Sequence, residues 1–75
     1  MRIYTFEDFN LGDAVFHKSN KQIEMVVIRM NEESRNITCR WINKNGEKLE
    51  TELFFAELIK SDDYRRSMAP RYGSI

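Results

Sequence analysis

The sequence is poor in the residues that cross-link small proteins. Its 75 residues include one cysteine and one histidine. A single cysteine excludes an intramolecular disulfide, and the lack of any Cys/His cluster at metal-ligand spacing argues against a structural zinc site. We therefore expect no metal and no cofactor. Stability must come from a compact apolar core, from a partner, or from both.

An excess of one charge and long apolar runs are also missing. Twelve basic and twelve acidic residues are mixed along the chain, so no overall field draws the protein onto nucleic acid or an anionic membrane. No apolar run approaches the roughly 18 residues of a membrane span, and the first residues do not resemble a secretory signal. A lone free thiol fits a reducing compartment. These absences together predict a cytoplasmic protein.

The clearest pattern that is present predicts a β-hairpin over residues 37–54. Ile37, Cys39 and Trp41 alternate with polar residues, as in a strand with one buried face. A three-residue loop that ends at Gly46, in the left-handed conformation of a bulged turn, keeps this face apolar. A two-residue loop would set carboxylates against it, so burial favours the longer loop. The resulting register pairs Trp41 with Leu49, Cys39 with Thr51, Ile37 with Leu53, Arg40 with Glu50, Thr38 with Glu52 and Ile42 with Lys48.

Further strands are predicted on both sides of this hairpin. A Gly-Asp turn precedes a strand over 14–18, and a second strand covers 24–30. Residues 55–59 predict either one helical turn or a turn into a short fifth strand. We therefore expect an all-β fold, a small and strongly bent antiparallel sheet of four or five short strands that closes into an SH3-like barrel.

The predicted organisation has three parts. An N-terminal lead over residues 1–8 packs on the barrel, the barrel domain occupies residues 9–60, and residues 61–75 form a disordered, flexible tail. The tail is polar, contains Pro70 and Gly73, and has no apolar period. The predicted core consists of Val15, Met25, Val27, Ile37, Cys39, Trp41, Leu49, Leu53, Phe54 and Leu58.

Four short motifs follow one another between residues 9 and 59. They are Phe9-Asn10-Leu11-Gly12-Asp13-Ala14-Val15, Met25-Val26-Val27, Thr38-Cys39-Arg40-Trp41, and Glu52-Leu53-Phe54 with Leu58. This ordered set resembles the YodC-like family of small uncharacterised bacterial proteins. The resemblance implies a compact bacterial β domain, and it carries over no catalytic residue because the family has no established activity. The chain departs from the family at residues 20–23, where relatives have a Gly-Gly-Pro turn, and at His17, where they often have an aliphatic residue.

Few residues of the sequence suit catalysis or metal binding. Cys39 lies in the middle of a strand on the apolar face, so we expect a buried, unreactive thiol. His17 has no third group to orient it as a base, and we interpret it as an ordinary strand histidine. We therefore predict no catalytic residue and no enzyme activity. A solvated face with weak ion pairs, rather than a cation site, is expected at Glu47, Glu50, Glu52 and Glu57.

The second predicted strand is apolar on both faces. Met25 and Val27 would point into the core. The N-terminal lead, through Ile3 and Phe6, covers the opposite face in one interpretation. In the other, that face is a protein interface, for a homodimer or a docking partner, with Phe16 as its anchor. The candidate interface residues are Phe16, Val26, Ile28 and Met30.

The tail interleaves arginines with tyrosines, a combination that stacks on bases and contacts phosphates. Arg65, Arg66 and Arg71 are the candidate nucleic-acid contacts, although Asp62 and Asp63 dilute their charge. The sequence as a whole predicts a non-catalytic small β-barrel binding module for protein–protein interaction, because the net charge is zero and the apolar stripe is specific. The alternative is a nucleic-acid-binding barrel that associates with RNA or the ribosome.

Overall fold

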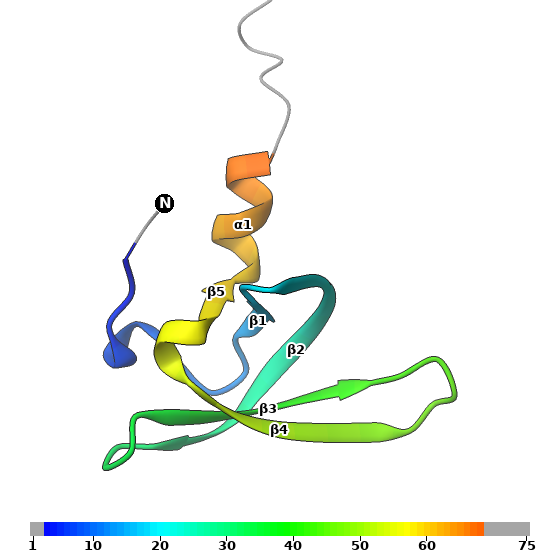
Figure 1. Ribbon diagram of the computed structural model, residues 1–75, viewed down its shortest axis with the longest axis horizontal. Coiled ribbons are helices and arrows are strands. Elements are labelled where there is room, and N and C mark those ends of the chain that lie inside the picture. Colours follow the sequence, from blue (N-terminus) through cyan, green and yellow to red (C-terminus); the bar gives the residue numbers. More distant parts are fainter. Residues whose placement is uncertain (1–2, 69–75) are drawn as a thin grey trace, which may run out of the picture.

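The computed structural model describes residues 3–68, which fold into a five-stranded antiparallel sheet with short helices around it (Figure 1). The all-β prediction is thereby confirmed. The strands are β1 (Ala14–His17), β2 (Asn20–Asn31), β3 (Asn36–Ile42), β4 (Lys48–Phe54) and β5 (Leu58–Lys60). A 3-10 helix, η1 (Phe6–Asp8), precedes β1, a second one, η2 (Phe55–Glu57), joins β4 to β5, and an α-helix, α1 (Ser61–Met68), follows β5.

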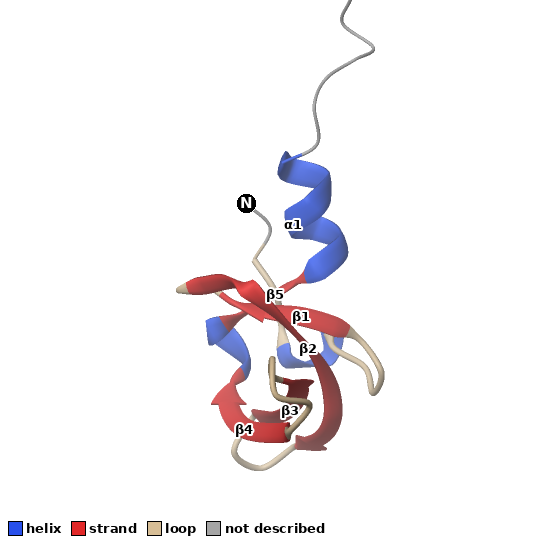
Figure 2. Cartoon of the chain, turned by 90° about the vertical axis from the view of Figure 1, so that its right-hand side faces the viewer, coloured by secondary structure: helices blue, strands red, loops and turns tan. Residues whose placement is uncertain are grey.

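The sheet has the strand order β4-β3-β2-β1-β5 and does not close. It bends strongly along β2, which passes from the side of β1 and β5 to the side of β3 and β4 (Figure 2). The two edge strands, β4 and β5, are connected through η2 and do not pair, so the prediction of an SH3-like barrel is wrong. The reason is the length of β5. It has three residues, which pair with β1, and it is followed directly by α1.

The predicted register of the β3–β4 hairpin is confirmed. Asn43 donates its N–H to the carbonyl of Glu47, and Gly46 donates to the carbonyl of Asn43, both at 3.0 Å. Gly46 has φ +81°, the left-handed conformation that costs glycine little because it has no Cβ. Every predicted pair occurs: Ile37–Leu53, Thr38–Glu52, Cys39–Thr51, Arg40–Glu50, Trp41–Leu49 and Ile42–Lys48.

An irregularity in β2 reorients the second half of this strand. The pairing with β3 shifts between Val27 and Arg29, so that Ile28 is an inserted residue. A bulge of this kind moves the residues that follow it to the opposite face. Met30 therefore lies opposite the buried Ile37 and packs against the core. Simple alternation along β2 predicts Met30 on the outside, and the bulge makes this prediction wrong.

The predicted core is confirmed in its centre and wrong at its ends. Trp41 and Leu53 are partly buried and pack against the core. Leu49 and Phe54, by contrast, are 37% and 44% exposed. Both lie near the ends of the edge strand β4, where no further strand covers them in the described part of the chain. The predicted core residues that are buried are Val15, Met25, Val27, Ile37, Cys39 and Leu58.

Aromatic residues outside the predicted core complete it. In the N-terminal lead Tyr4 and Phe6 are buried, whereas Ile3 is 92% exposed. The rings of Tyr4 and Phe9 pack at a centroid distance of 5.2 Å. The buried residues that the sequence analysis left out of the core are Tyr4, Phe6, Phe9, Phe16 and Ile59.

Residues 61–68 form α1, so the prediction of a disordered tail from residue 61 is wrong for these positions. Ser61 is buried, and its hydroxyl donates a hydrogen bond to the carboxylate of Glu24 on β2. The ring of Tyr64 packs edge-on against Phe16 at 5.4 Å between centroids. These contacts hold the first turns of α1 against the sheet. The remainder of the predicted tail, residues 69–75, lies outside the described residues.

Candidate ligand groove

An open groove of about 300 Å³ lies on the core-side face of the sheet, next to the β1–β2 turn. Its volume is at the lower end of the range found for ligand sites. Most of its floor is apolar, and its polar groups come from the β1–β2 turn with the residues that flank it and from Thr51 of β4. The groove is lined by His17, Ser19, Asn20, Ile23, Met25, Trp41, Thr51 and Leu53. We call it the Trp41 groove.

Strand alternation places the floor of the Trp41 groove. Trp41 of β3 and Leu53 of β4 point to the same side of the sheet as the buried Met25 of β2. Because the sheet does not close, no described strand covers these side chains from the other side. Trp41 is only partly buried as a result, and Ile23 is 38% exposed.

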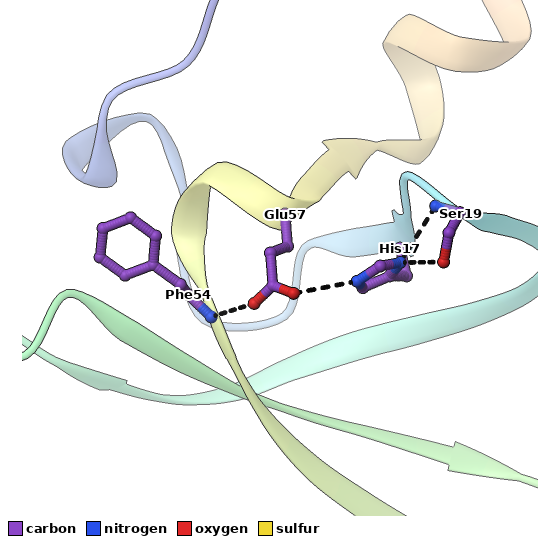
Figure 3. Close-up of polar contacts among 4 residues, drawn as sticks. All are labelled: His17, Ser19, Phe54 and Glu57. Atoms are coloured by element: carbon purple, nitrogen blue, oxygen red, sulfur yellow. Dashed lines mark hydrogen bonds and ion pairs between the residues drawn. The ribbon is translucent and has the colours of Figure 1, made fainter.

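The rim of the Trp41 groove is fixed by a hydrogen-bonded chain centred on His17 (Figure 3). Nδ1 of His17 accepts the backbone N–H of Ser19 at 3.0 Å, and the Ser19 hydroxyl lies 2.7 Å from the same nitrogen. Because an N–H can only donate, the proton of the neutral ring resides on Nε2. Nε2 lies 3.2 Å from Oε1 of Glu57 and donates to it.

Glu57 connects this rim to the end of β4. Its second oxygen, Oε2, accepts the backbone N–H of Phe54 at 2.9 Å. The hydrogen bond from His17 and, secondly, the one from Phe54 hold the pKa of the Glu57 carboxyl below its usual value. The carboxylate thus ties the β1–β2 turn to η2 and keeps one wall of the groove in place.

The hydrogen bonds that run from Ser19 through His17 to Glu57 resemble those of a catalytic triad, but their geometry does not activate the serine. The backbone N–H of Ser19 already occupies the Nδ1 lone pair that would have to take up the hydroxyl proton. Ser19 follows His17 by two residues in an exposed turn, which is a common local hydrogen-bonding pattern. The arrangement therefore stabilises the turn and presents the Ser19 hydroxyl at the groove.

The buried thiol does not supply a nucleophile either. Cys39 is completely buried, and burial raises its pKa to about 11. The thiol is therefore neutral and out of reach of a substrate, as the sequence analysis predicted for this residue. No group of three or more His, Cys, Asp or Glu side chains capable of holding a metal ion occurs in the described part of the chain.

The structure divides the predicted interface residues. Phe16 is buried beneath Tyr64, so the prediction that it anchors an exposed patch is wrong, and Met30 faces the core because of the β2 bulge. Val26 and Ile28 remain on the outer face, where Val26 is 44% exposed. They line a shallow groove of about 370 Å³ together with Ile42, which is 64% exposed. We call Val26, Ile28 and Ile42 the outer-face patch.

The candidate nucleic-acid contacts do not form a separate basic cluster. Arg65 on α1 lies 3.0 Å from the carboxylate of Glu24, and Arg66 lies 3.8 Å from that of Asp63. Each of these arginines is thus partly neutralised by a neighbouring acid. Arg71 lies outside the described residues.

Among residues 3–68, no helix has the length and apolar character needed to span a membrane.

No protein-family model, curated protein or solved structure matches the chain. The resemblance to YodC-like proteins therefore stays a prediction.

Sequence reasoning missed the residues that make the groove a site. Ile23 stands alone among polar residues between positions 18 and 24, and this isolated apolar side chain was the available signal. The contribution of Ser19 had no signal, because it depends on the tight turn that brings its N–H onto His17.

Proposed function

We propose that the protein is a non-catalytic binding module that takes an apolar side chain of another protein's extended segment into the Trp41 groove. One observation carries this proposal: a partly exposed tryptophan forms the floor of an apolar groove with a fixed polar rim. Tryptophan is, with tyrosine and arginine, one of the residue types enriched among the energetically dominant contacts of protein interfaces.

The rim supports recognition of a peptide more than of a purely apolar molecule. The Ser19 hydroxyl and the side chain of Asn20 line the groove beside the apolar floor. These groups provide donors and acceptors for the backbone of an extended segment, while the floor accepts its side chain. His17 stays in place through Glu57, so the rim is ordered before the ligand binds. The buried neutral thiol fits our placement of this module in the cytoplasm.

Trp41 is the single tryptophan of the chain, so its fluorescence reports directly on the groove. Peptides selected from a phage-displayed random library against the protein are titrated while the Trp41 emission is followed. We expect a blue shift on binding and at least about tenfold weaker binding by Ile23→Asp, because a carboxylate is then placed at the apolar wall. Ile42→Asp is the matched control, since it introduces the same charge at an exposed isoleucine on the opposite face.

The opposite pattern contradicts the proposal. If Ile42→Asp abolishes binding and Ile23→Asp does not, the outer-face patch is the site. The nucleic-acid alternative is tested in parallel by fluorescence anisotropy with a labelled single-stranded RNA. Salt-sensitive RNA binding that is weakened by Arg65→Glu, together with no selected peptide that shifts the Trp41 emission, would favour that alternative.

A further inference from the structure

The edge strand β4 is long and regular, and no described strand pairs with its outer edge. It has seven residues, contains no proline, and pairs with β3 without a bulge. Natural edge strands are usually short, bulged, covered or charged, because their free backbone groups otherwise pair with another chain. Of these features β4 has only the charges, at Lys48, Glu50 and Glu52. The other edge, β5, follows this rule, with three residues and α1 directly after it. In the described part of the chain no strand pairs with the outer edge of β4 (Figure 1).

The hydrogen bonds at both ends of the β3–β4 ladder identify the free backbone groups of β4. The N–H of Asn43 donates to the carbonyl of Glu47, and the N–H of Phe55 donates to the carbonyl of Arg35 at 3.1 Å. The backbone N–H and C=O groups of the odd-numbered residues of β4 therefore point towards β3. Alternation in an antiparallel pair then directs the N–H and C=O groups of even-numbered residues outward. The outward N–H of Phe54 is accepted by Glu57. The outward backbone groups that remain for a partner belong to Lys48, Glu50 and Glu52.

The charged side chains of β4 complement those of β4 in a second copy of the chain. In an antiparallel pair of two β4 strands centred on Glu50, Lys48 lies opposite Glu52 of the second copy at both ends. Glu50 meets its own counterpart at the centre, but each Glu50 is held by its own Arg40, with Nη2 at 2.7 Å and Nε at 3.0 Å from Oε2. Opposite charges directly across an antiparallel pair stabilise it.

Neighbouring registers fit less well. Outward backbone groups pair with outward groups, so the register changes only in steps that keep this parity. Centring the pair on Thr51 sets Glu50 against Glu52 of the second copy twice, which is repulsive. Centring it on Leu49 places Glu52 opposite Gly46 of the second copy. Gly46 lies in the hairpin turn, outside β4, so this end of the pair is lost. The Glu50-centred register therefore combines the most backbone hydrogen bonds, about six, with complementary charges.

We infer that two copies of this chain associate through antiparallel pairing of their β4 strands about a twofold axis at Glu50, which creates a continuous ten-stranded sheet. The axis is perpendicular to the sheet, so both Trp41 grooves face the same side of the dimer. The half-exposed Leu49 lies opposite Thr51 of the second copy and becomes covered. The inference does not depend on the proposed peptide binding, since it concerns the edge of the sheet and not the groove.

Charge reversal tests both the interface and its register. Within the hairpin, Lys48 of β4 lies opposite Ile42 of β3, and Glu52 lies opposite Thr38. Reversing either charge therefore breaks no ion pair between directly opposite residues of the hairpin. Sedimentation equilibrium of the wild-type protein, up to roughly 1 mM, should show a mass that rises from 9.0 kDa towards twice that value. Lys48→Glu and Glu52→Lys should each weaken dimerisation about tenfold, because both ends then carry like charges. The double variant Lys48→Glu/Glu52→Lys should restore it.

Matched controls and a second measurement keep the test decisive. Lys18→Glu in the β1–β2 turn and Glu33→Lys in the β2–β3 turn make the same charge changes away from the edge and should leave dimerisation unchanged. In the wild-type protein, amide hydrogen exchange at Glu50 should slow with increasing protein concentration, while exchange at the inward-facing Thr51 stays constant. A monomer at every concentration overturns the inference. A dimer that neither single variant weakens, or that the double variant fails to restore, overturns it as well.

Discussion

The hydroxyl of Tyr4 donates a hydrogen bond to the carboxylate of Asp63, 59 residues further along the chain. The same hydroxyl oxygen accepts the backbone N–H of Lys60 at 3.3 Å. One nearly buried side chain of the N-terminal lead thus joins β5 to the first turn of α1. The two ends of the described chain stabilise each other through this contact and through Nζ of Lys60, which lies 5.8 Å from the centre of the Phe9 ring.

Tyr4→Phe tests the contribution of this link. The ring keeps its place in the core, but Asp63 and the N–H of Lys60 each lose a partner. We expect the free energy of unfolding to fall by about 1–2 kcal/mol, measured by urea denaturation, and amide exchange in α1 to accelerate. Ile3→Ala, at a position that is 92% exposed, should stay within about 0.5 kcal/mol of the wild-type protein. Equal stability of Tyr4→Phe and the wild-type protein would contradict the role assigned to the hydroxyl.

The β3–β4 hairpin shows what the sequence predicts well. Its strand alternation and the left-handed residue at Gly46 are local signals, and together they determine the register. The bulge at Ile28 has no such signal. Because β2 is apolar on both faces around this residue, the sequence shows no break in alternation where the extra residue is inserted. The prediction that Met30 faces outward as part of the interface was therefore wrong.

Long-range packing explains the other errors. Residues 3–9 are too few to show a period, and they are held by contacts far away in the sequence: Tyr4 contacts β5 and α1, and Phe9 lies beneath Lys60 of β5. The burial of Phe16 likewise requires Tyr64 from a segment whose polar composition predicted disorder. The Trp41 groove exists because the sheet stays open, which depends on the shortness of β5 and not on any motif.

The thiol of Cys39 should be a sensor of unfolding. Because burial raises its pKa to about 11 in the folded protein, the thiolate is rarer than in the unfolded chain by about 100-fold near pH 8. We expect reaction with Ellman's reagent at pH 8 to be at least that much slower in the native protein than in concentrated urea. Rapid labelling of the native protein would show that the centre of β3 is accessible, against the burial described here.

The same pKa shift predicts a loss of stability at high pH. A group whose pKa is raised by folding stabilises the fold fully below its unfolded pKa and loses this contribution as the pH rises towards the folded value. The free energy of unfolding should therefore decrease between about pH 8.5 and pH 11. Cys39→Ala removes the titrating group, so this variant should lose less stability than the wild-type protein over the same interval. Parallel pH profiles of the two proteins would contradict the prediction.

Gly46 tests the geometry of the hairpin loop. A Cβ at this position would meet no atom within 4 Å, so substitution carries no steric clash with neighbouring residues. The remaining cost is that of a positive φ, which we expect to lower the free energy of unfolding by about 1 kcal/mol in Gly46→Ala. Gly46→Asn should cost less, because asparagine tolerates the left-handed region better. Equal losses in both variants, measured by urea denaturation, would argue against a φ-based effect.

The link between His17 and Glu57 should give the protein a characteristic acid response. Folding lowers the pKa of the Glu57 carboxyl, chiefly through the hydrogen bond from His17 and also through the N–H of Phe54. A carboxyl of this kind stabilises the fold fully above its unfolded pKa of about 4.3, and the contribution disappears as the pH falls through the lower folded value. Glu57→Gln should therefore have a lower melting temperature than the wild-type protein at pH 7. The difference should vanish at acidic pH.

Two comparisons separate this effect from a general loss of charge. Glu32→Gln, in the exposed turn after β2, makes the same substitution away from His17 and should follow the wild-type pH profile. In a His17→Ala background, Glu57→Gln should change the melting temperature much less, because the largest cause of the lowered pKa is then absent. If the melting temperatures of Glu57→Gln and the wild-type protein differ by the same amount at every pH, the carboxylate does not act through its charge. The rim of the Trp41 groove would then be held by neutral hydrogen bonds, and ligand binding at the groove should be insensitive to acid.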